Sequence, residues 1–225
     1  MTVQRLAEGL WRWTAAHPEW REGDDWGRAV GSVYCETPEA VVVFDPLVPA
    51  EGGDVDRFWD ALDRDVARLA LPVVVLLTCS WHVRSAADVR DRYSASVWAP
   101  PAGGEGLEGL VSDVLGDGGW PVDGVQAFLM GAPPGPSEEA AYWIPSHRAI
   151  VLGDLLIGDG AGGVRLAPAE WYSDSPAERD RFRTDVVTSL ERLAASCDPS
   201  LLLPAHGDPV TAGAAAALRA SLVGM

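Results

Sequence analysis

The sequence contains no lysine, three cysteines and four histidines. All 17 basic residues are therefore arginines, and 33 acidic residues outnumber them to give a net charge of -16. Phosphate binding needs clustered basic side chains, and a strongly acidic chain repels polyanions and anionic lipid surfaces. We expect neither a nucleic-acid partner nor a membrane partner.

Long apolar runs and a disulfide framework are also missing. No apolar stretch approaches the ~20 residues that a membrane span needs, and residues 1–11 lack the apolar core of a signal peptide. Cys35, Cys79 and Cys197 are widely spaced and odd in number, unlike the cysteines of disulfide-rich secreted proteins. The expected location is the cytoplasm.

The remaining composition suits one α/β domain spanning residues 1–225, because 48% of the chain is hydrophobic. Short apolar runs and amphipathic stretches occur in both halves, which favours two packed sheets with helices outside. Asp54, Ser85 and a capping box at Ser175–Glu178 are predicted to start helices. Strands are predicted over residues 30–35, 41–44, 73–77, 97–99, 125–129, 140–144, 149–152 and 201–203, and helices over 54–69, 85–93 and 176–193 and from about 212, with a helical turn at 107–115.

Four segments, in order, resemble the metallo-β-lactamase superfamily. They are Val-Val-Val-Phe-Asp-Pro-Leu at 41–47, Val-Leu-Leu-Thr at 75–78 with Val-Trp-Ala-Pro at 97–100, Ala-Ile-Val-Leu-Gly-Asp-Leu-Leu at 149–156, and Leu-Leu-Leu-Pro-Ala-His-Gly-Asp-Pro at 201–209. The resemblance implies an αββα sandwich with a site at one edge, between the sheets. Fold alone does not determine function.

The metal-binding motif of that superfamily is degenerate here. The motif reads Thr-His-x-His-x-Asp-His, whereas Thr78 is followed by Cys-Ser-Trp-His-Val-Arg at 79–84. His82 falls at a position where the motif accepts any residue, and residues 130–137, where another histidine is expected, contain none. A two-zinc site of this family uses five histidines, so the four here exclude it. Only Asp154 and His206 match expected ligands.

Asp154 and His206 are the principal candidates for metal binding or acid–base chemistry. His82 would complete a set of two histidines and one carboxylate that holds a single zinc or iron ion. The alternatives are structural: an aspartate accepting backbone N–H bonds in a turn, a histidine bonded within its loop, and a histidine packed against Trp81. The cofactor prediction is thus either none or one Zn or Fe ion.

Other residues around the motif have two interpretations each. Cys79 is a thiolate ligand or nucleophile, or else a small buried side chain. Arg84 cannot bind a cation, and instead clasps an anion or pairs with Asp154. His17 approaches the pocket or is structural, and His147 is a solvated turn residue. The tryptophans either line an apolar pocket or pack in the core: Trp81, Trp98, Trp120 and Trp143.

Two classes of function remain open. The first is a diverged hydrolase or lyase that acts on a small molecule with one metal or none. The second is a non-catalytic relative that binds a ligand or partner at the same edge, and a weaker third is metal-free catalysis by Cys79. The substrate and the oligomeric state are not predicted. We expect residues 78–84, Asp154 and His206 to meet in one cleft, because ligand sites form where loops gather at strand ends.

Overall fold

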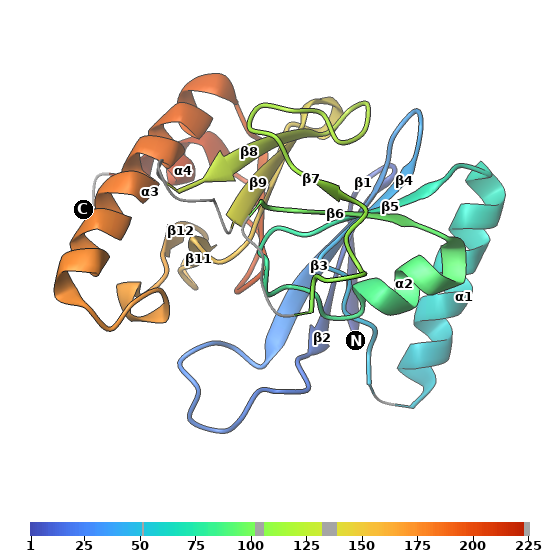
Figure 1. Cartoon of the computed structure of the whole chain (residues 1–225). Coiled ribbons are helices and arrows are strands. Elements are labelled where there is room, and N and C mark those ends of the chain that lie inside the picture. Colours follow the sequence, from blue (N-terminus) through green and yellow to red (C-terminus); the bar gives the residue numbers. More distant parts are fainter. Residues whose placement is uncertain (51, 102–105, 132–138, 223–225) are drawn as a thin grey trace.

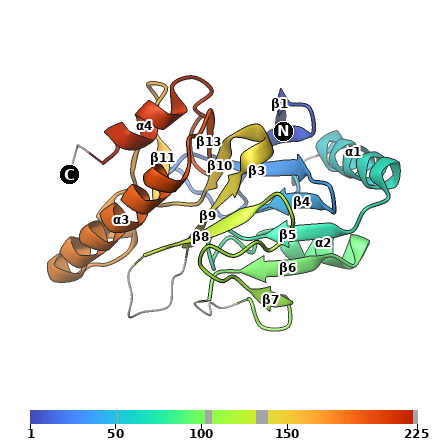
Figure 2. The same ribbon diagram turned by 90° about the horizontal axis from the view of Figure 1, so that it is seen from above.

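Two β-sheets face each other, and helices cover the outer face of each sheet (Figure 1). The structure is a computed structural model that describes residues 1–50, 52–101, 106–131 and 139–222. Seen from above, α1 and α2 lie on one side of the sandwich, and α3 and α4 lie on the other (Figure 2). This arrangement is the predicted αββα sandwich.

The first sheet has seven strands in sequence order, and the second has four in the order β13-β10-β9-β8. In the first sheet β1 to β4 are antiparallel, and β4 to β7 are parallel. Its strands are β1 (Thr2–Ala7), β2 (Leu10–Ala16), β3 (Ala29–Glu36), β4 (Val41–Phe44), β5 (Val73–Leu76), β6 (Ser96–Ala99) and β7 (Asp113–Val114).

The second sheet is built mainly from the second half of the chain, and a small hairpin accompanies it. Its strands are β8 (Gln126–Met130), β9 (Glu139–Ile144), β10 (Ala149–Leu152) and β13 (Leu201–Pro204), and the hairpin is β11 (Leu156–Gly158) with β12 (Val164–Leu166). The helices are α1 (Gly53–Leu69), α2 (Ala86–Tyr93), α3 (Pro176–Ser196) and α4 (Ala214–Ala220), with 3-10 turns at Pro145–His147 and Ala169–Trp171.

The apolar strands are buried on both faces, which explains why they lack polar alternation. In β4, Val42 and Phe44 face the core between the sheets, while Val41 and Val43 pack beneath the first pair of helices. In β10, Val151 faces the inner core and Ile150 packs toward α3 and α4. The two strands thus belong to different sheets, in agreement with the two packed sheets that the sequence predicted.

Several helix starts differ in detail from the prediction. Gly52, and not Asp54, is the N-cap of α1, because Asp54 instead bonds the chain's amino group. Ser175 is the N-cap of α3, but its side chain makes no capping bond. The hydroxyl of Ser173 takes its place by donating to Glu178 and accepting from Ser175 N.

Two N-terminal strands are additional to the prediction. The side chains of β1 are mostly exposed, so its sequence lacks the apolar signal of the central strands. The helical turn predicted at 107–115 is confirmed for its first half, because Leu110 N and Val111 N both donate to Leu107 O at 3.1 Å, while the second half contains the two-residue β7. The histidine-free stretch 130–137 lies mostly outside the described residues.

Among the described helices, none combines the length and the apolarity of a membrane span.

Candidate functional site

The three predicted site residues meet where loops from both sheets converge. His82 follows β5, Asp154 follows β10 and His206 follows β13. Oδ1 of Asp154 lies 3.2 Å from Nε2 of His82 and 3.3 Å from Nε2 of His206. The predicted convergence is confirmed, although 52 residues separate Asp154 from His206 in sequence (206 − 154).

Asp45, at the end of β4, organises the loop that carries His82. Its Oδ1 accepts a 2.7 Å bond from Thr78 N, and its Oδ2 accepts the Thr78 hydroxyl and lies 2.9 Å from His82 Nδ1. All three residues are buried. Sequence reasoning used Asp45 only as a fold marker, but its place directly after an apolar strand was the available signal.

His82 therefore lies between two carboxylates. Burial and the nearby Arg84 disfavour its protonated form, but Asp154 and Asp45 outweigh them and raise the pKa of His82 to about 9. This direction of shift favours the protonated imidazole in the metal-free protein at neutral pH. Its packing against Trp81 is an edge contact with ring centroids 6.4 Å apart, so the carboxylates define its position better than the indole does.

Asp154 has one oxygen bonded and one oxygen without a hydrogen bond. Trp81 Nε1 donates a 2.8 Å bond to Oδ2. Oδ1 is buried and accepts no hydrogen bond, even though the two imidazole nitrogens are near it. Burial opposes ionisation, yet His82 and then His206 hold the pKa of Asp154 well below its usual range. A buried, ionised oxygen without a hydrogen bond is a feature that a bound cation would explain.

Arg84 pairs with backbone carbonyls, so the predicted partner Asp154 is wrong. Its Nη1 donates to Gly31 O at 2.9 Å and to Asp45 O at 3.1 Å, while Nη2 lies 3.4 Å from His82 Nε2. The backbone of Arg84 has a φ of 41°, a left-handed conformation that costs energy for a residue with a side chain. The guanidinium lies at the start of β3 and the end of β4, where these two carbonyls accept its bonds.

Glu139, the first residue of β9, is a buried carboxyl that sequence reasoning missed. Its Oε2 accepts the backbone N–H groups of Asp154 and Leu155 at 3.2 and 3.0 Å, and Tyr172 donates its hydroxyl to Oε1 at 2.7 Å. Burial and the charge of Asp154 raise the pKa of Glu139 to about 8. Glu139 thus fixes the turn that aims Asp154 into the site.

The loop carrying His206 is anchored to the first sheet. Gly31 N donates to Ala205 O at 2.7 Å, and the buried Arg12 donates from Nη2 to Pro204 O at 3.2 Å and Gly207 O at 2.7 Å. Glycine at 31 makes room for this guanidinium, because a Cβ there would lie 2.6 Å from Arg12 Nη2 and would displace it. Contacts across the sandwich therefore set the position of His206.

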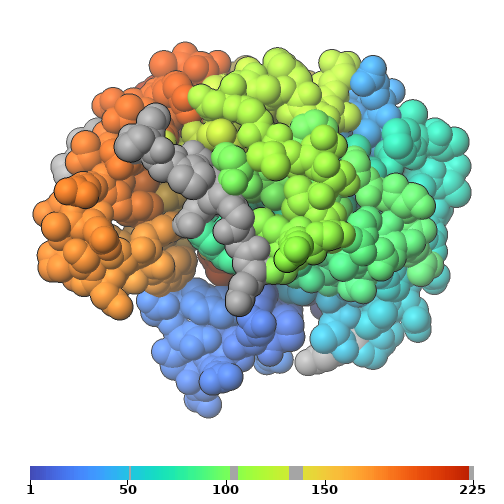
Figure 3. Space-filling view, in the orientation of Figure 1, coloured from blue at the N-terminus to red at the C-terminus, as the bar shows by residue number. Residues whose placement is uncertain are grey.

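A cleft of ≈ 790 Å³ opens above these residues. Trp26 and Trp171 stand edge-on to His206, with ring centroids at 5.6 and 5.9 Å, and His17 and Trp81 also line the cleft. Trp171 Nε1 donates to Asp25 across its mouth at 2.7 Å. Figure 3 shows the blue N-terminal segment projecting below the orange and green surface. The cleft volume of ≈ 790 Å³ is within the range of small-molecule sites.

Only some of the predicted pocket residues line this cleft. Trp98 and Trp143 are partly buried against the core clusters, and Trp120 is 53% exposed. Sequence reasoning missed Trp26 and Trp171, which come from loops far apart in the chain. His147, predicted to be solvated, is half-buried and outside the cleft lining.

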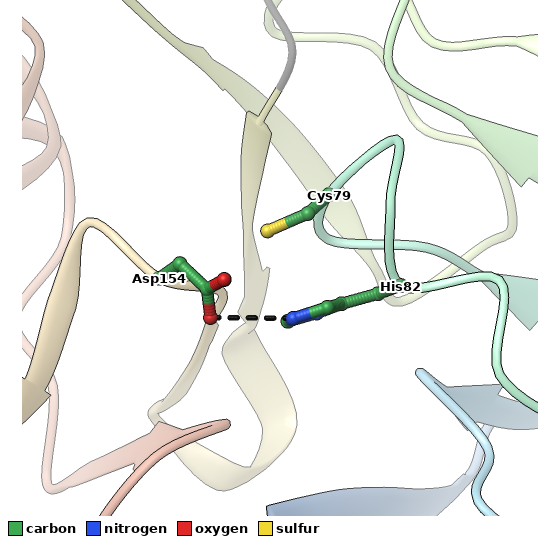
Figure 4. A group of neighbouring side chains, drawn as sticks. All are labelled: Cys79, His82 and Asp154. Atoms are coloured by element: carbon green, nitrogen blue, oxygen red, sulfur yellow. Dashed lines mark ion pairs between the residues drawn. The ribbon is translucent and has the colours of Figure 1, made fainter. Parts of the chain in front are cut away.

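Cys79 lies beside His82 and Asp154. One ligand atom from each of the three lies within 4.8 Å of the others, and all three side chains are buried. Burial, then the charges of Glu139 and Asp154, raises the pKa of Cys79 well above its usual range. This environment disfavours a free thiolate nucleophile. Figure 4 shows Cys79 and His82 reaching from one loop toward Asp154 on another.

No family model matches the chain, and no curated protein matches it. Solved structures do. A metallo-β-lactamase from Pontibacter korlensis is similar over 99% of this chain and 97% of its own, with a TM-score of 0.66 and 14% identity. The chain has the metallo-β-lactamase fold. The metallo-β-lactamase IND-7 is similar over 99% and 97%, with a TM-score of 0.63 and 17% identity.

A metallo-β-lactamase from Erythrobacter litoralis, solved with β-mercaptoethanol in its active site, is similar over 98% of this chain and 94% of its own, with a TM-score of 0.64 and 17% identity. At these identities the metallo-β-lactamase fold is what the chain shares with the three proteins. What it does depends on its own residues.

Proposed function

We propose that this protein is a hydrolase-like member of the metallo-β-lactamase fold that acts on a small molecule, with a centre that holds at most one metal ion. The observation that carries the proposal is the position of His82, Asp154 and His206 in the lining of the indole-walled cleft. Groups that titrate or bind metals, gathered in one concave site, are typical of an active site.

The residues present fit one ion. Asp154 Oδ1 is ionised, buried and without a hydrogen bond, and imidazole nitrogens lie 3.2 and 3.3 Å from it. Asp154 and His82, with His206 beside them, would hold the ion, and a zinc or iron ion held there would supply Lewis acidity and lower the pKa of bound water. Among the described residues no second group of three potential ligands occurs, so nothing supports a second ion.

The chain's own residues would bind and orient the substrate. Trp26, Trp81 and Trp171 offer apolar ring surface, and the N–H groups of Trp81 and Trp171 are already bonded to carboxylates. His206 Nε2 lies at the cleft floor, where it can accept a proton from a nucleophile or return one to a leaving group. Arg12 and Gly31 hold the loop that positions this imidazole.

The alternative is a non-catalytic protein that binds a ligand in the same cleft. The observation in its favour is Trp81, which stands where the resemblance expects a histidine ligand and whose indole N–H bonds Asp154 Oδ2. Arg84 also places a guanidinium 3.4 Å from His82 Nε2, and the repulsion between like charges weakens the binding of any cation there. In this case the cleft and its tryptophans keep their role, and turnover is absent.

The test separates binding from turnover. Protein purified without added metal, then loaded with one equivalent of zinc, is assayed against chromogenic esters, thioesters and amides, while tryptophan fluorescence records binding. We expect both quenching and turnover, with turnover lost in Asp154→Asn and His206→Ala and retained in the remote His147→Ala. Fluorescence quenching without turnover, both with and without zinc, would support the non-catalytic alternative. If the protein shows no quenching and no turnover, both proposed functions are refuted.

A further inference from the structure

We propose that Cys79 is a metal ligand, so that Cys79, His82 and Asp154 form a three-donor site with one thiolate. This deepens the proposed function and rests on its one-ion centre. The site would take zinc or another ion that binds sulfur, and not magnesium, calcium or manganese, because soft thiolate donors favour the former. From the sequence, His82, Asp154 and His206 were the expected ligand set and Cys79 was a separate candidate, whereas the structure groups Cys79 with His82 and Asp154.

The loop after β5 brings the first two donors together. His82 N donates to Cys79 O at 3.1 Å, which closes a tight turn and places both side chains on the same side of the loop. In Figure 4 the sulfur of Cys79 and the imidazole of His82 both point toward Asp154. The three ligand atoms lie within 4.8 Å of one another, a separation that small side-chain rotations can close around an ion.

The third donor, Asp154, can approach the other two because the preceding residue, 153, is glycine. A Cβ added at Gly153 would lie 2.4 Å from Cys79 Sγ and 2.9 Å from Thr78 Oγ1. The two loops therefore touch only because position 153 has no side chain. A bridge between Cys79 and Glu139 fixes the register of this contact.

An independent observation points to a ligand at this place. Asp154 is 7% exposed, and its Oδ1 has no hydrogen-bond partner, while Trp81 occupies Oδ2. A buried carboxylate oxygen normally accepts hydrogen bonds, and leaving one without them is costly. This oxygen lies 3.2 Å from His82 Nε2 and 3.3 Å from His206 Nε2, so a cation that bound it would take the place of an imidazolium proton among the cysteine and histidine donors.

The charges balance with a divalent ion. When the ion binds, two protons leave to solvent: the thiol proton of Cys79, so that sulfur binds as a thiolate, and the proton that His82 carries in the metal-free protein, so that His82 binds as a neutral imidazole. One thiolate and one carboxylate then supply two negative charges against the 2+ of the ion. Cys35 and Cys197 lie in the hydrophobic core clusters and belong to no group of three potential ligands in the described chain.

The experiment uses the full chain, stripped with a chelator and titrated with Co²⁺. We expect a thiolate-to-cobalt charge-transfer band at one equivalent, retained in the matched buried-cysteine variants Cys35→Ser and Cys197→Ser and lost in Cys79→Ser. Cobalt bound without this band, a band that survives Cys79→Ser, or no binding at all would each overturn the proposal.

A second measurement does not depend on the folding of the variant. In wild-type protein under mild denaturant, zinc should protect Cys79 from alkylation more than it protects Cys35 or Cys197, as mapped by peptide mass spectrometry. Equal protection of all three thiols would contradict the proposal. If cobalt binds without a thiolate band, the ligand role of Cys79 is refuted but the proposed one-ion hydrolase is not. If the thiolate band appears but no substrate is turned over, the hydrolase proposal is refuted and the metal site is retained.

Discussion

Asp45 Oδ2 and His82 Nδ1 lie 2.9 Å apart in a pair that is almost fully excluded from water. Asp45 also receives two bonds from Thr78, so its loss leaves three donors unsatisfied. Because removing one partner of a buried pair costs about 3–5 kcal/mol, we expect Asp45→Ala to lower the free energy of unfolding by that order. Urea denaturation measures it.

The control for Asp45→Ala is the exposed ion pair between Arg148 and Asp198. Exposed pairs contribute about 0–1 kcal/mol, so Asp198→Ala should change the urea midpoint little. Equal effects of the two substitutions would contradict the organising role given to Asp45.

Arg84 should weaken the binding of any cation at the site. Its Nη2 lies 3.4 Å from His82 Nε2, where its charge repels a divalent ion. We expect Arg84→Met to tighten zinc binding by roughly tenfold or more, which corresponds to about 1.4 kcal/mol. Isothermal calorimetry of Arg84→Met and the remote control Arg148→Met checks this, and unchanged or weaker binding in Arg84→Met would show that the guanidinium moves away.

The three thiols should be unreactive in the native protein. All are buried, and burial raises the pKa of Cys35 to about 12 and that of Cys197 to about 11. Thiolates are the reactive species, so a disulfide reagent at pH 8 should label almost nothing until denaturant is added, and then all three cysteines. A thiol that reacts rapidly in the native state would revive nucleophilic catalysis by Cys79 if it maps to that residue.

Metal-free stability should decline with rising pH through the titration of His82. Its folded pKa of about 9 lies above the ordinary 6.5, so its stabilising contribution is complete below pH 6.5 and is lost as pH rises through 9. Glu139, with a folded pKa of about 8 against an ordinary 4.5, acts in the same direction between those values. We therefore expect unfolding free energies, measured with chelator present, to fall from pH 6.5 to 9.

Substitution separates the two contributions to this slope. His82→Gln should flatten the decline above pH 8, and Glu139→Gln should flatten it below pH 8. His147→Gln is the matched control, because burial lowers the pKa of His147 and its titration contributes no decline in this range. An unchanged slope in His82→Gln would mean that His82 is neutral in the folded protein.

The sequence predicted two packed sheets because strand and helix patterns occur in both halves of the chain, and the αββα sandwich followed from the family resemblance. Runs such as Val73–Leu76 have no polar alternation, and this marks strands covered on both sides. The exposed β1 lacks such a run, so local sequence does not reveal it. Its pairing with β2 depends on backbone bonds, which any side chain permits.

The part of the site that could be predicted from the sequence consists of single residues that directly follow apolar strands. His82, Asp154 and His206 each follow an apolar strand, and their convergence follows from the fold. Glu139 and Trp171 could not be predicted, because their roles arise from contacts with residues distant in the chain. The partner of Arg84 was predicted wrongly, because its guanidinium bonds the backbone carbonyls of Gly31 and Asp45, and a sequence pattern does not reveal contacts to backbone atoms distant in the chain.

The hydrogen bond between Trp171 and Asp25 joins two segments 146 residues apart across the mouth of the cleft, and it is exposed to solvent. A single exposed hydrogen bond contributes only about 0.5–1.5 kcal/mol, far less than the stability of a whole domain. Thermal fluctuations therefore break this contact many times for every global unfolding event. For a ligand bound in the cleft as proposed, we therefore expect loss of this indole–carboxylate contact to change the ligand residence time while the overall stability of the protein changes little.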